Sequence, residues 1–167
     1  MVESKGHPAT DTSETLIQQE YKKATEKAMN LLLQKDRTKK ELEDRLFRAG
    51  FSEQATQYAM RYVMEFGYIN DFRYAADYID LHKRNRSRLE LQIKLMKKGV
   101  DSEVIAQAFE SYEAEDEEEA IRTMLQKRLR GKRLSDMEYA DRNKVTAYLA
   151  RKGYALPVVK RIMRELF

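Results

Sequence analysis

Apolar residues recur along this chain at the three- and four-residue spacing of amphipathic helices, and no run of alternating β-branched residues predicts a strand. The pattern occurs three times, each time around a glycine. Apolar residues lie eight and four positions before each glycine, and again five, nine and thirteen positions after it. The predicted turn glycines are Gly50, Gly99 and Gly153, and the predicted core residues before them are Leu42, Leu46, Leu91, Leu95, Val145 and Leu149.

A tandem repeat of a three-helix unit explains this pattern, because the positions before the glycine stripe one helix and those after it stripe the next. We predict an all-α fold with a loose tail at 1–12 and three-helix repeats at 13–69, 70–112 and 113–167. The first repeat includes an N-terminal helical extension. Since a unit of about 50 residues buries little surface alone, we expect neighbouring repeats to share contacts in an elongated, curved array.

Three predicted helix starts carry the capping-box pattern, in which a hydroxyl and a carboxylate three residues later satisfy free backbone amides. They are Thr38–Glu41, Ser87–Glu90 and Ser135–Glu138. We expect the first helix to begin near Ser13 or Thr15 and to end near Lys35.

The composition favours helices around a thin core, with 42% hydrophobic residues, 36% charged residues, six glycines and two prolines. The absence of cysteine excludes disulfides and thiolate zinc sites. No apolar run approaches the roughly 18 residues that span a membrane, and the N-terminus lacks a signal-peptide core. We therefore expect a cytoplasmic protein without a membrane partner.

The residue types that catalysis needs are scarce in this sequence. The two histidines are His7 in the predicted tail and His82 near a helix end, and no glycine-rich phosphate loop occurs. Asp77 and Asp80 lie on one helix face and could share a metal, but two exposed helical acids more often only solvate that face. We expect no catalytic activity, no cofactor and no metal site.

Basic clusters are the stronger chemical signal in a chain of net charge +4. Cations in the last turn of a helix complement its dipole, which accounts for those before Gly99 and Gly153. It does not account for five cations within 127–133, where nucleic-acid contact is the competing interpretation. The candidate partner contacts are Lys83, Arg84, Arg86, Arg88, Lys97, Lys98, Lys127, Arg128, Arg130, Lys132, Arg133, Arg151 and Lys152.

An acidic run at 113–119 opens the third repeat. It is either a solvated helix start, an interaction patch for a basic partner, or a shield that limits affinity for DNA.

The stretch 67–75 predicts a helix end followed at once by a helix start. Gly67 can close a helix in the left-handed conformation, and Asn70 is a good N-cap with Asp71 in the first turn. We expect Arg73 to fix local geometry, by pairing with Asp77 or by reaching the preceding repeat. A tight connection between two packed helices is the simplest interpretation.

Together with the three tandem units, this stretch resembles the bacterial RecX regulatory proteins. That family carries a Gly-Tyr-(Leu/Ile)-(Asp/Asn)-Asp-x-Arg-(Phe/Tyr)-Ala motif at the start of its second repeat. A second family motif resembles residues 94–100, with Lys94 where the family usually has Glu, and Ser87 stands where the family often has Gly. The resemblance runs from about residue 22 to the C-terminus. The first motif is matched by Gly67, Tyr68, Asp71, Arg73, Tyr74 and Ala75.

The resemblance implies a crescent-shaped, non-enzymatic protein that lies in the groove of the RecA recombinase filament on DNA. Such proteins block filament growth and damp ATP hydrolysis, strand exchange and co-protease action in the SOS response, and some also bind DNA directly. We expect a monomer. Two hypotheses stay open: a regulator of the RecA filament, and a plain DNA-binding helical protein that acts through its basic clusters. A scaffold for another partner is the third.

Overall fold

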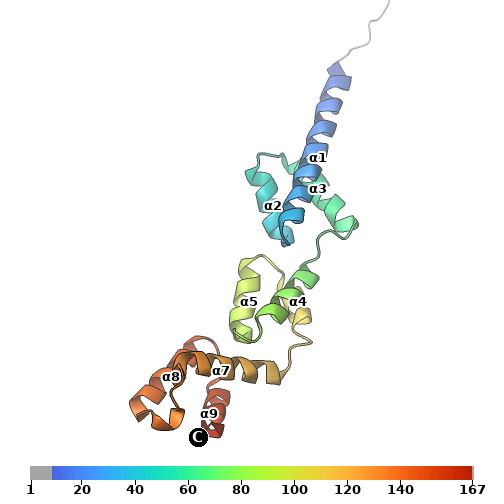
Figure 1. The fold of residues 1–167 in the computed structure, drawn as a ribbon. Helices are drawn as coiled ribbons and strands as arrows, with labels where there is room; N and C mark the ends of the chain where they lie inside the picture. The colour runs from blue at the N-terminus through green and yellow to red at the C-terminus, as the bar shows by residue number, and fades with distance from the viewer. Residues whose placement is uncertain (1–8, 167) are drawn as a thin grey trace, which may run out of the picture. The chain divides into compact units, whose positions relative to one another are not determined.

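The computed structural model describes the backbone of residues 9–166 and the side chains of residues 13–166 (Figure 1). Within that range it contains nine α-helices, one short 3-10 helix and no strand, which confirms the predicted all-α fold of three-helix repeats. The elements are α1 (Ala9–Gln34), α2 (Lys39–Arg48), α3 (Glu53–Glu65), α4 (Asp71–His82), α5 (Arg88–Lys97), α6 (Ser102–Ala108), α7 (Ala114–Leu129), η1 (Leu134–Asp136), α8 (Tyr139–Arg151) and α9 (Leu156–Glu165). No described helix combines the length and the apolar character that crossing a membrane requires.

Helix α1 begins at Ala9, four residues before the expected start at Ser13. The predicted tail at 1–12 is therefore wrong for its last four residues, which are helical. Its first eight residues lie outside the described part of the chain. Residues 9–12 carry no apolar stripe, so the periodic pattern that marked the helix start appears one turn late.

The chain divides into two compact units, residues 1–71 and 72–167. In the first unit, α1 packs mainly on α3 and also touches α2. Four alanines at the α1–α3 contact are fully buried, and such small side chains let helix backbones approach closely. Leu42 and Leu46 on α2 are also fully buried in this core.

Side-chain caps tie the helix starts of the first unit together. Thr38 and Glu41 form the predicted capping box of α2. Glu20 on α1 accepts both the Ser52 backbone N–H at 2.8 Å and the Ser52 hydroxyl at 2.9 Å, and thus fixes the start of α3. Asp71 is buried and accepts the Lys39 backbone N–H at 2.8 Å. The Asp71 carboxylate therefore lies at the start of α2 as well as in the first turn of α4.

The second unit holds two separate apolar cores, one for each of the two remaining repeats. The core of α4–α6 contains Leu91 and Leu95, both fully buried, and the core of α7–α9 contains Val145 and Leu149. On α9 the predicted position Ile162 is fully buried, whereas Val158 is only partly buried and its neighbour Val159 is fully buried. The second repeat shows the same pattern, with Val104 partly buried and Ile105 buried. Three cores for nine helices explain why the hydrophobic pattern repeats three times.

A tight contact inside the second unit joins repeats two and three. The Ser87 side chain is fully buried and accepts the Glu90 backbone N–H at 3.1 Å. Its hydroxyl donates to the Lys152 carbonyl at 2.6 Å. Next to that carbonyl, a Cβ built on Gly153 would lie 2.8 Å from the Ser87 Oγ atom and 3.1 Å from Leu89 Cβ. Gly153 is therefore required by this contact as well as by its positive φ of 93°.

The third predicted capping box is wrong. Ser135 lies in η1, and α8 begins only at Tyr139, where Glu138 is the N-cap residue and makes no side-chain cap hydrogen bond. The Leu134 side chain is buried in the third core. Burial of this leucine holds Ser135 and Asp136 in a separate turn and overrides the local capping pattern.

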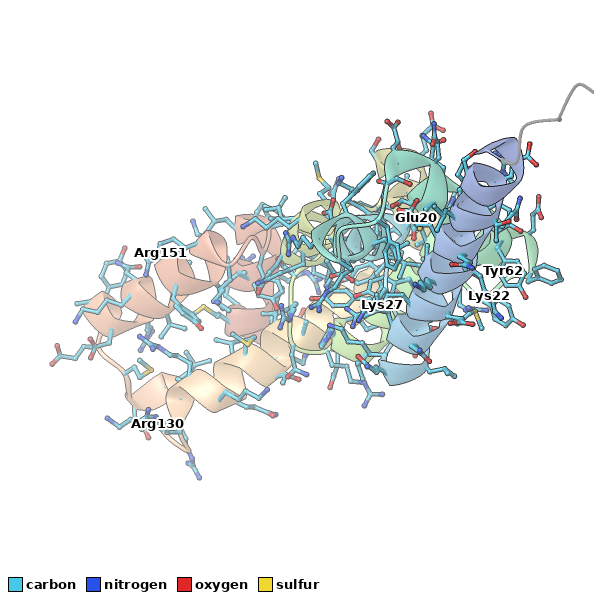
Figure 2. All side chains as sticks on the ribbon, turned by 90° about the horizontal axis from the view of Figure 1, so that it is seen from above. Glu20, Lys22, Lys27, Tyr62, Arg130 and Arg151 are labelled. Atoms are coloured by element: carbon cyan, nitrogen blue, oxygen red, sulfur yellow. The ribbon has the colours of Figure 1, made fainter. Side chains whose placement is uncertain are left out.

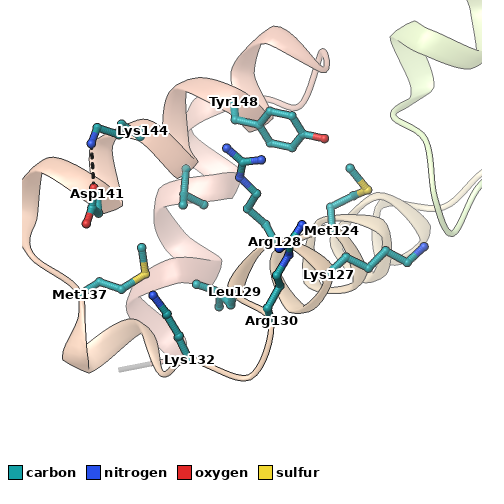
Figure 3. Close-up of a pocket in the computed structure, with 11 residues that line it drawn as sticks. Met124, Lys127, Arg128, Leu129, Arg130, Lys132, Met137, Asp141, Lys144 and Tyr148 are labelled. Atoms are coloured by element: carbon teal, nitrogen blue, oxygen red, sulfur yellow. Dashed lines mark hydrogen bonds and ion pairs between the residues drawn. The ribbon is translucent and has the colours of Figure 1, made fainter.

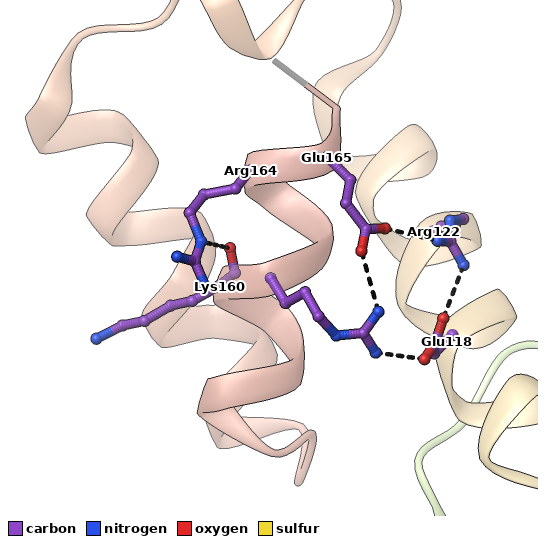
Figure 4. A network of polar contacts seen from close by, with 6 residues as sticks. Glu118, Arg122, Lys160, Arg164 and Glu165 are labelled. Atoms are coloured by element: carbon purple, nitrogen blue, oxygen red, sulfur yellow. Dashed lines mark hydrogen bonds and ion pairs between the residues drawn. The ribbon is translucent and has the colours of Figure 1, made fainter.

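Polar contacts use much of the acidic run at 113–119. Asp116 pairs with Lys83 at 3.2 Å, and Glu118 contacts both Arg122 and Arg161. Glu165 joins the two arginines, so that a closed ring of four charges links α7 to α9 (Figure 4). The hydrogen bond from Arg161 holds the pKa of Glu118 below its usual range. Part of the acidic run is therefore used to hold the third repeat together.

Candidate nucleic-acid interface

The third repeat contains a groove of about 540 Å³ between the end of α7 and the face of α8 (Figure 3). Its apolar lining residues are Met124, Leu129, Met137 and Val145. Its charged and aromatic lining residues are Lys127, Arg128, Arg130 and Lys132 from the α7 end and its loop, and Asp141, Lys144 and Tyr148 from α8. We call this the third-repeat groove.

Charge in the third-repeat groove is strongly positive. Five cations line it against a single carboxylate, and that carboxylate is already paired, because Lys144 Nζ lies 2.9 Å from Asp141 Oδ1. The hydrogen bond from Lys144 lowers the pKa of Asp141 and so keeps it ionised. Arg130 and Lys132 are exposed and form no ion pair among the described residues. These two side chains are therefore available to an incoming anion.

Tyr148 gives the groove an aromatic wall. The Arg128 guanidinium carbon lies 4.8 Å from the centre of its ring, and Lys152 Nζ lies 6.0 Å from it. Such cation–π contacts hold the long side chains over the ring. Arg128 and Tyr148 therefore form one combined cationic and aromatic surface of the groove.

Backbone geometry presents Arg130 at the tip of the loop after α7 (Figure 2). Its φ of 48° and ψ of 43° lie in the left-handed region, where it caps the helix ahead of Gly131. A residue other than glycine or asparagine is uncommon at such a position. The Arg130 side chain lines the groove from this position.

The remaining candidate cations divide into those with internal contacts and those without. Lys83 pairs with Asp80 and Asp116, and Arg86 lies 3.6 Å from Glu90. The rings of Phe109 and Tyr112 hold Arg88, and the ring of Tyr74 holds Lys98. Exposed candidates with no ion pair in the described part of the chain are Arg84, Lys97, Arg133 and Arg151.

Residues of the stretch 67–75 have different environments. Gly67 takes a φ of 69° and closes the turn after α3. Asp71 and Ala75 are buried, Tyr74 is half-buried, and Tyr68 is 46% exposed. Arg73 is exposed. The geometric role expected for Arg73 stays a prediction, whereas Asp71 has a clear structural contact with Lys39.

No cluster of three or more potential metal ligands occurs within the described residues. Asp80 is paired with Lys83, which separates it from Asp77 as a shared ligand. His82 packs edge-on against Tyr78 at 4.5 Å, and partial burial lowers the pKa of its imidazole. His7 lies outside the described part of the chain.

Several groove residues were not among the sequence candidates, and Lys144 and Tyr148 are the two that add a positive charge and an aromatic ring. Lys144 and Tyr148 lie on α8, and only the packing of α8 against α7 brings them beside the predicted cluster at 127–133. Their four-residue spacing, which places a lysine above a tyrosine on one helix face, is a weak signal that the sequence did contain. Arg133, in contrast, belongs to the predicted cluster but does not line the groove.

Comparison with known proteins identifies two of the three three-helix units. Residues 24–62 match the model of the first RecX three-helix domain, and residues 115–163 match that of the third. A "Regulatory protein RecX" of Amycolatopsis mediterranei is 35% identical over 154 residues, covering 89% of this chain and 87% of that protein. One of Caldanaerobacter subterraneus is 32% identical over 146 residues, covering 86% of this chain and 71% of that protein.

Solved structures agree with the sequence relatives. The crystal structure of RecX from Lactobacillus salivarius superposes with a TM-score of 0.78 at 26% identity, over 89% of this chain and 97% of that one. A second crystal structure, titled as regulatory protein RecX, gives a TM-score of 0.82 at 19% identity over 97% of this chain and 80% of that one. At that identity the second likeness concerns the fold alone.

Proposed function

The chain belongs to the RecX family of regulatory proteins, and from this membership we propose that it binds the RecA nucleoprotein filament and inhibits it. Inhibition extends to filament growth, ATP hydrolysis, strand exchange and co-protease activity in DNA repair and the SOS response. The protein acts without catalytic activity or a cofactor of its own, as a monomer in the cytoplasm.

The observation that carries this proposal is the 35% identity to a RecX protein along nearly the whole chain. The fold is compatible with it, because three repeats with separate cores offer several independent contact surfaces. Weak contacts from several repeats to successive subunits of a filament add through effective concentration. A target that carries both protein and DNA also suits a surface with separate acidic and basic regions.

The test is the DNA-dependent ATPase of RecA on single-stranded DNA, measured against increasing amounts of this protein. We expect suppression at substoichiometric ratios, since one bound molecule blocks growth of a whole filament. A control series raises the DNA concentration at fixed RecA, because an inhibitor that only competes for DNA loses its effect there. Full ATPase activity at a several-fold excess of this protein would reject the proposal.

The third-repeat groove supports a second candidate function, direct binding of DNA. With about five phosphate contacts, the logarithm of the affinity for duplex DNA should fall against the logarithm of salt concentration with a slope near −4.5. Lys132→Gln should make that slope shallower by about 0.9. Arg133→Gln is the matched control, because it removes a neighbouring exposed charge that does not line the groove. A salt-independent affinity would exclude this function.

The same variant separates the two functions. If protein contacts dominate, Lys132→Gln weakens binding to bare DNA more than it weakens inhibition of the RecA ATPase. Equal losses in both assays would indicate that DNA binding underlies the inhibition.

A further inference from the structure

The first repeat contains a second basic cleft, formed by two adjoining cavities. One, of about 340 Å³, is lined by Lys27 and Leu31 of α1 and by the end of α2. The other, of about 190 Å³, extends to the loop between α1 and α2. Arg45 and Arg48 line both cavities, so the two lie next to each other. We call this the Arg37 cleft, after the most buried of its five cations, which are Lys27, Lys35, Arg37, Arg45 and Arg48.

Arg37 is the unusual residue of the cleft, because its side chain is only 6% exposed. Its Nε–H donates to the Leu31 carbonyl at 3.2 Å, and within the described part of the chain no carboxylate pairs with it. None of the Arg37 side-chain nitrogens is both fully buried and unpaired among the described residues, so the donors that Leu31 does not use reach the surface of the smaller cavity. An anion that enters this cavity can therefore meet the guanidinium group.

The acidic residues of the cleft do not supply this anion. Asp44 lines the smaller cavity but pairs at 2.8 Å with Lys40, which lines neither cavity. Glu41 accepts the Thr38 backbone N–H at 3.4 Å as part of the capping box. Arg45 and Arg48 form no ion pair among the described residues and are exposed. The cleft therefore has an excess of unpaired positive charge.

From this geometry we infer that the Arg37 cleft is a phosphate-binding site for the backbone of a nucleic-acid strand. A guanidinium fork binds a phosphate through two parallel N–H···O bonds. The cations come from α1, the following loop and α2, and they extend over both cavities, so that successive phosphates of one strand are accommodated (Figure 2 shows Lys27 on α1). The lining offers Leu31 and Ala49 as its apolar surface, which leaves no pocket for the side chains that peptide recognition needs. This site does not depend on the proposed action on RecA.

The test compares full-length variants in binding to a fluorescein-labelled oligo(dT) single strand, followed by fluorescence anisotropy at several salt concentrations. We expect Arg45→Gln/Arg48→Gln to weaken binding about tenfold at low salt. The salt slope should become shallower by about 1.4, because each phosphate contact on a single strand contributes about 0.7. Arg61→Gln is the matched control: Arg61 is an exposed cation on α3 of the same repeat that lines neither cavity. It should change the affinity less than twofold.

Arg37→Lys examines the buried charge itself, because lysine keeps the positive charge and loses the planar fork. We expect weaker binding at an unchanged melting temperature. If this variant unfolds, the double variant Arg45→Gln/Arg48→Gln tests the inference on its own, because neither of these side chains forms an ion pair within the described residues. A wild-type salt slope for the Arg45/Arg48 variant would overturn the inference. So would displacement of the oligonucleotide by poly-glutamate at equal charge concentration, which would identify an acidic peptide as the ligand. Both results leave the ATPase test of the RecA proposal unaffected.

Discussion

Replacing Gly153 by alanine is the sharpest perturbation of this fold, because an equivalent glycine provides its control. Gly153 has a φ of 93° and Gly50 a φ of 88°, so that an added Cβ strains both backbones equally. Around Gly50 nothing lies within 4 Å of that Cβ. At Gly153 it meets Ser87 Oγ at 2.8 Å and two atoms of Leu89 at 3.1 Å. The difference between the two variants therefore isolates the contact between repeats two and three.

The shared backbone term is about 1–2 kcal/mol for an L-residue in the left-handed region. It is partly offset by the lower entropy of the unfolded alanine chain. Gly153→Ala adds overpacking against Leu89, which costs about 1–3 kcal/mol. It also displaces the Ser87 hydroxyl from the Lys152 carbonyl, a hydrogen bond that contributes about 1 kcal/mol. We expect Gly153→Ala to destabilise the protein by about 2–4 kcal/mol more than Gly50→Ala does.

Urea-induced unfolding followed by circular dichroism measures the free energies of both variants. Hydrogen–deuterium exchange then locates the loss, which for Gly153→Ala should appear in α5 and α8. Adding Ser87→Ala to Gly153→Ala should cost less than the sum of the two single changes, because the shorter side chain removes the 2.8 Å contact. Equal losses for Gly50→Ala and Gly153→Ala would refute the tight contact between these repeats.

Three further substitutions test other parts of the structure. Asp71→Ala should destabilise the first unit by about 2 kcal/mol in urea unfolding, because it removes a charge-assisted hydrogen bond to the Lys39 amide; Asp71→Asn keeps an acceptor and should cost less. Glu118→Gln should reduce the loss of stability at low pH. Arg161 keeps the pKa of Glu118 in the folded protein below its unfolded value. Glu118 therefore contributes stability above its unfolded pKa, and this contribution is lost as the pH falls through its folded pKa. Melting temperatures from pH 6 down to pH 3 measure this, and an unchanged pH profile would contradict it. Arg130→Gly should raise the melting temperature, because glycine relieves the left-handed backbone, while it weakens DNA binding in the anisotropy assay; a loss of both stability and binding would show that the Arg130 side chain supports the loop.

The sequence predicts the repeat well because the spacing of apolar residues along the helices corresponds to the positions that are buried. Leu42, Leu91 and Leu149 are all fully buried, each in its own core. Local chemistry also predicts the caps that depend on neighbouring residues, as at Thr38. It fails at Ser135, where burial of Leu134 in the third core outweighs the capping pattern. A local capping pattern cannot predict where a helix begins when burial in the core holds the preceding residues in a separate turn.

Functional surfaces are harder to predict, because they combine residues that are distant in sequence. The cluster at 127–133 stands out as a run of cations, and the structure places four of its five in the groove. The Arg37 cleft has no such run: Lys27, Arg37 and Arg45 are separated by eight or ten positions. Their side chains meet only because α2 folds back beside α1, so the cleft becomes visible in the structure alone.

Comparison of the repeats separates the structural from the binding role of one recurring cation. Two positions before each turn glycine stand Arg48, Lys97 and Arg151, each at the end of its helix, where a positive charge complements the dipole by about 0.3–1 kcal/mol. In all three repeats this cation therefore stabilises its helix in the same way. Only Arg48 also lines the cleft that holds the buried Arg37. The presence of a cation at this position in every repeat is therefore explained by the helix dipole. Whether that cation also binds a ligand depends on the residues around it in each repeat. Loss of DNA affinity from Arg48→Gln without a matching loss from Lys97→Gln would follow from this difference, because the two changes remove the same helix-end charge.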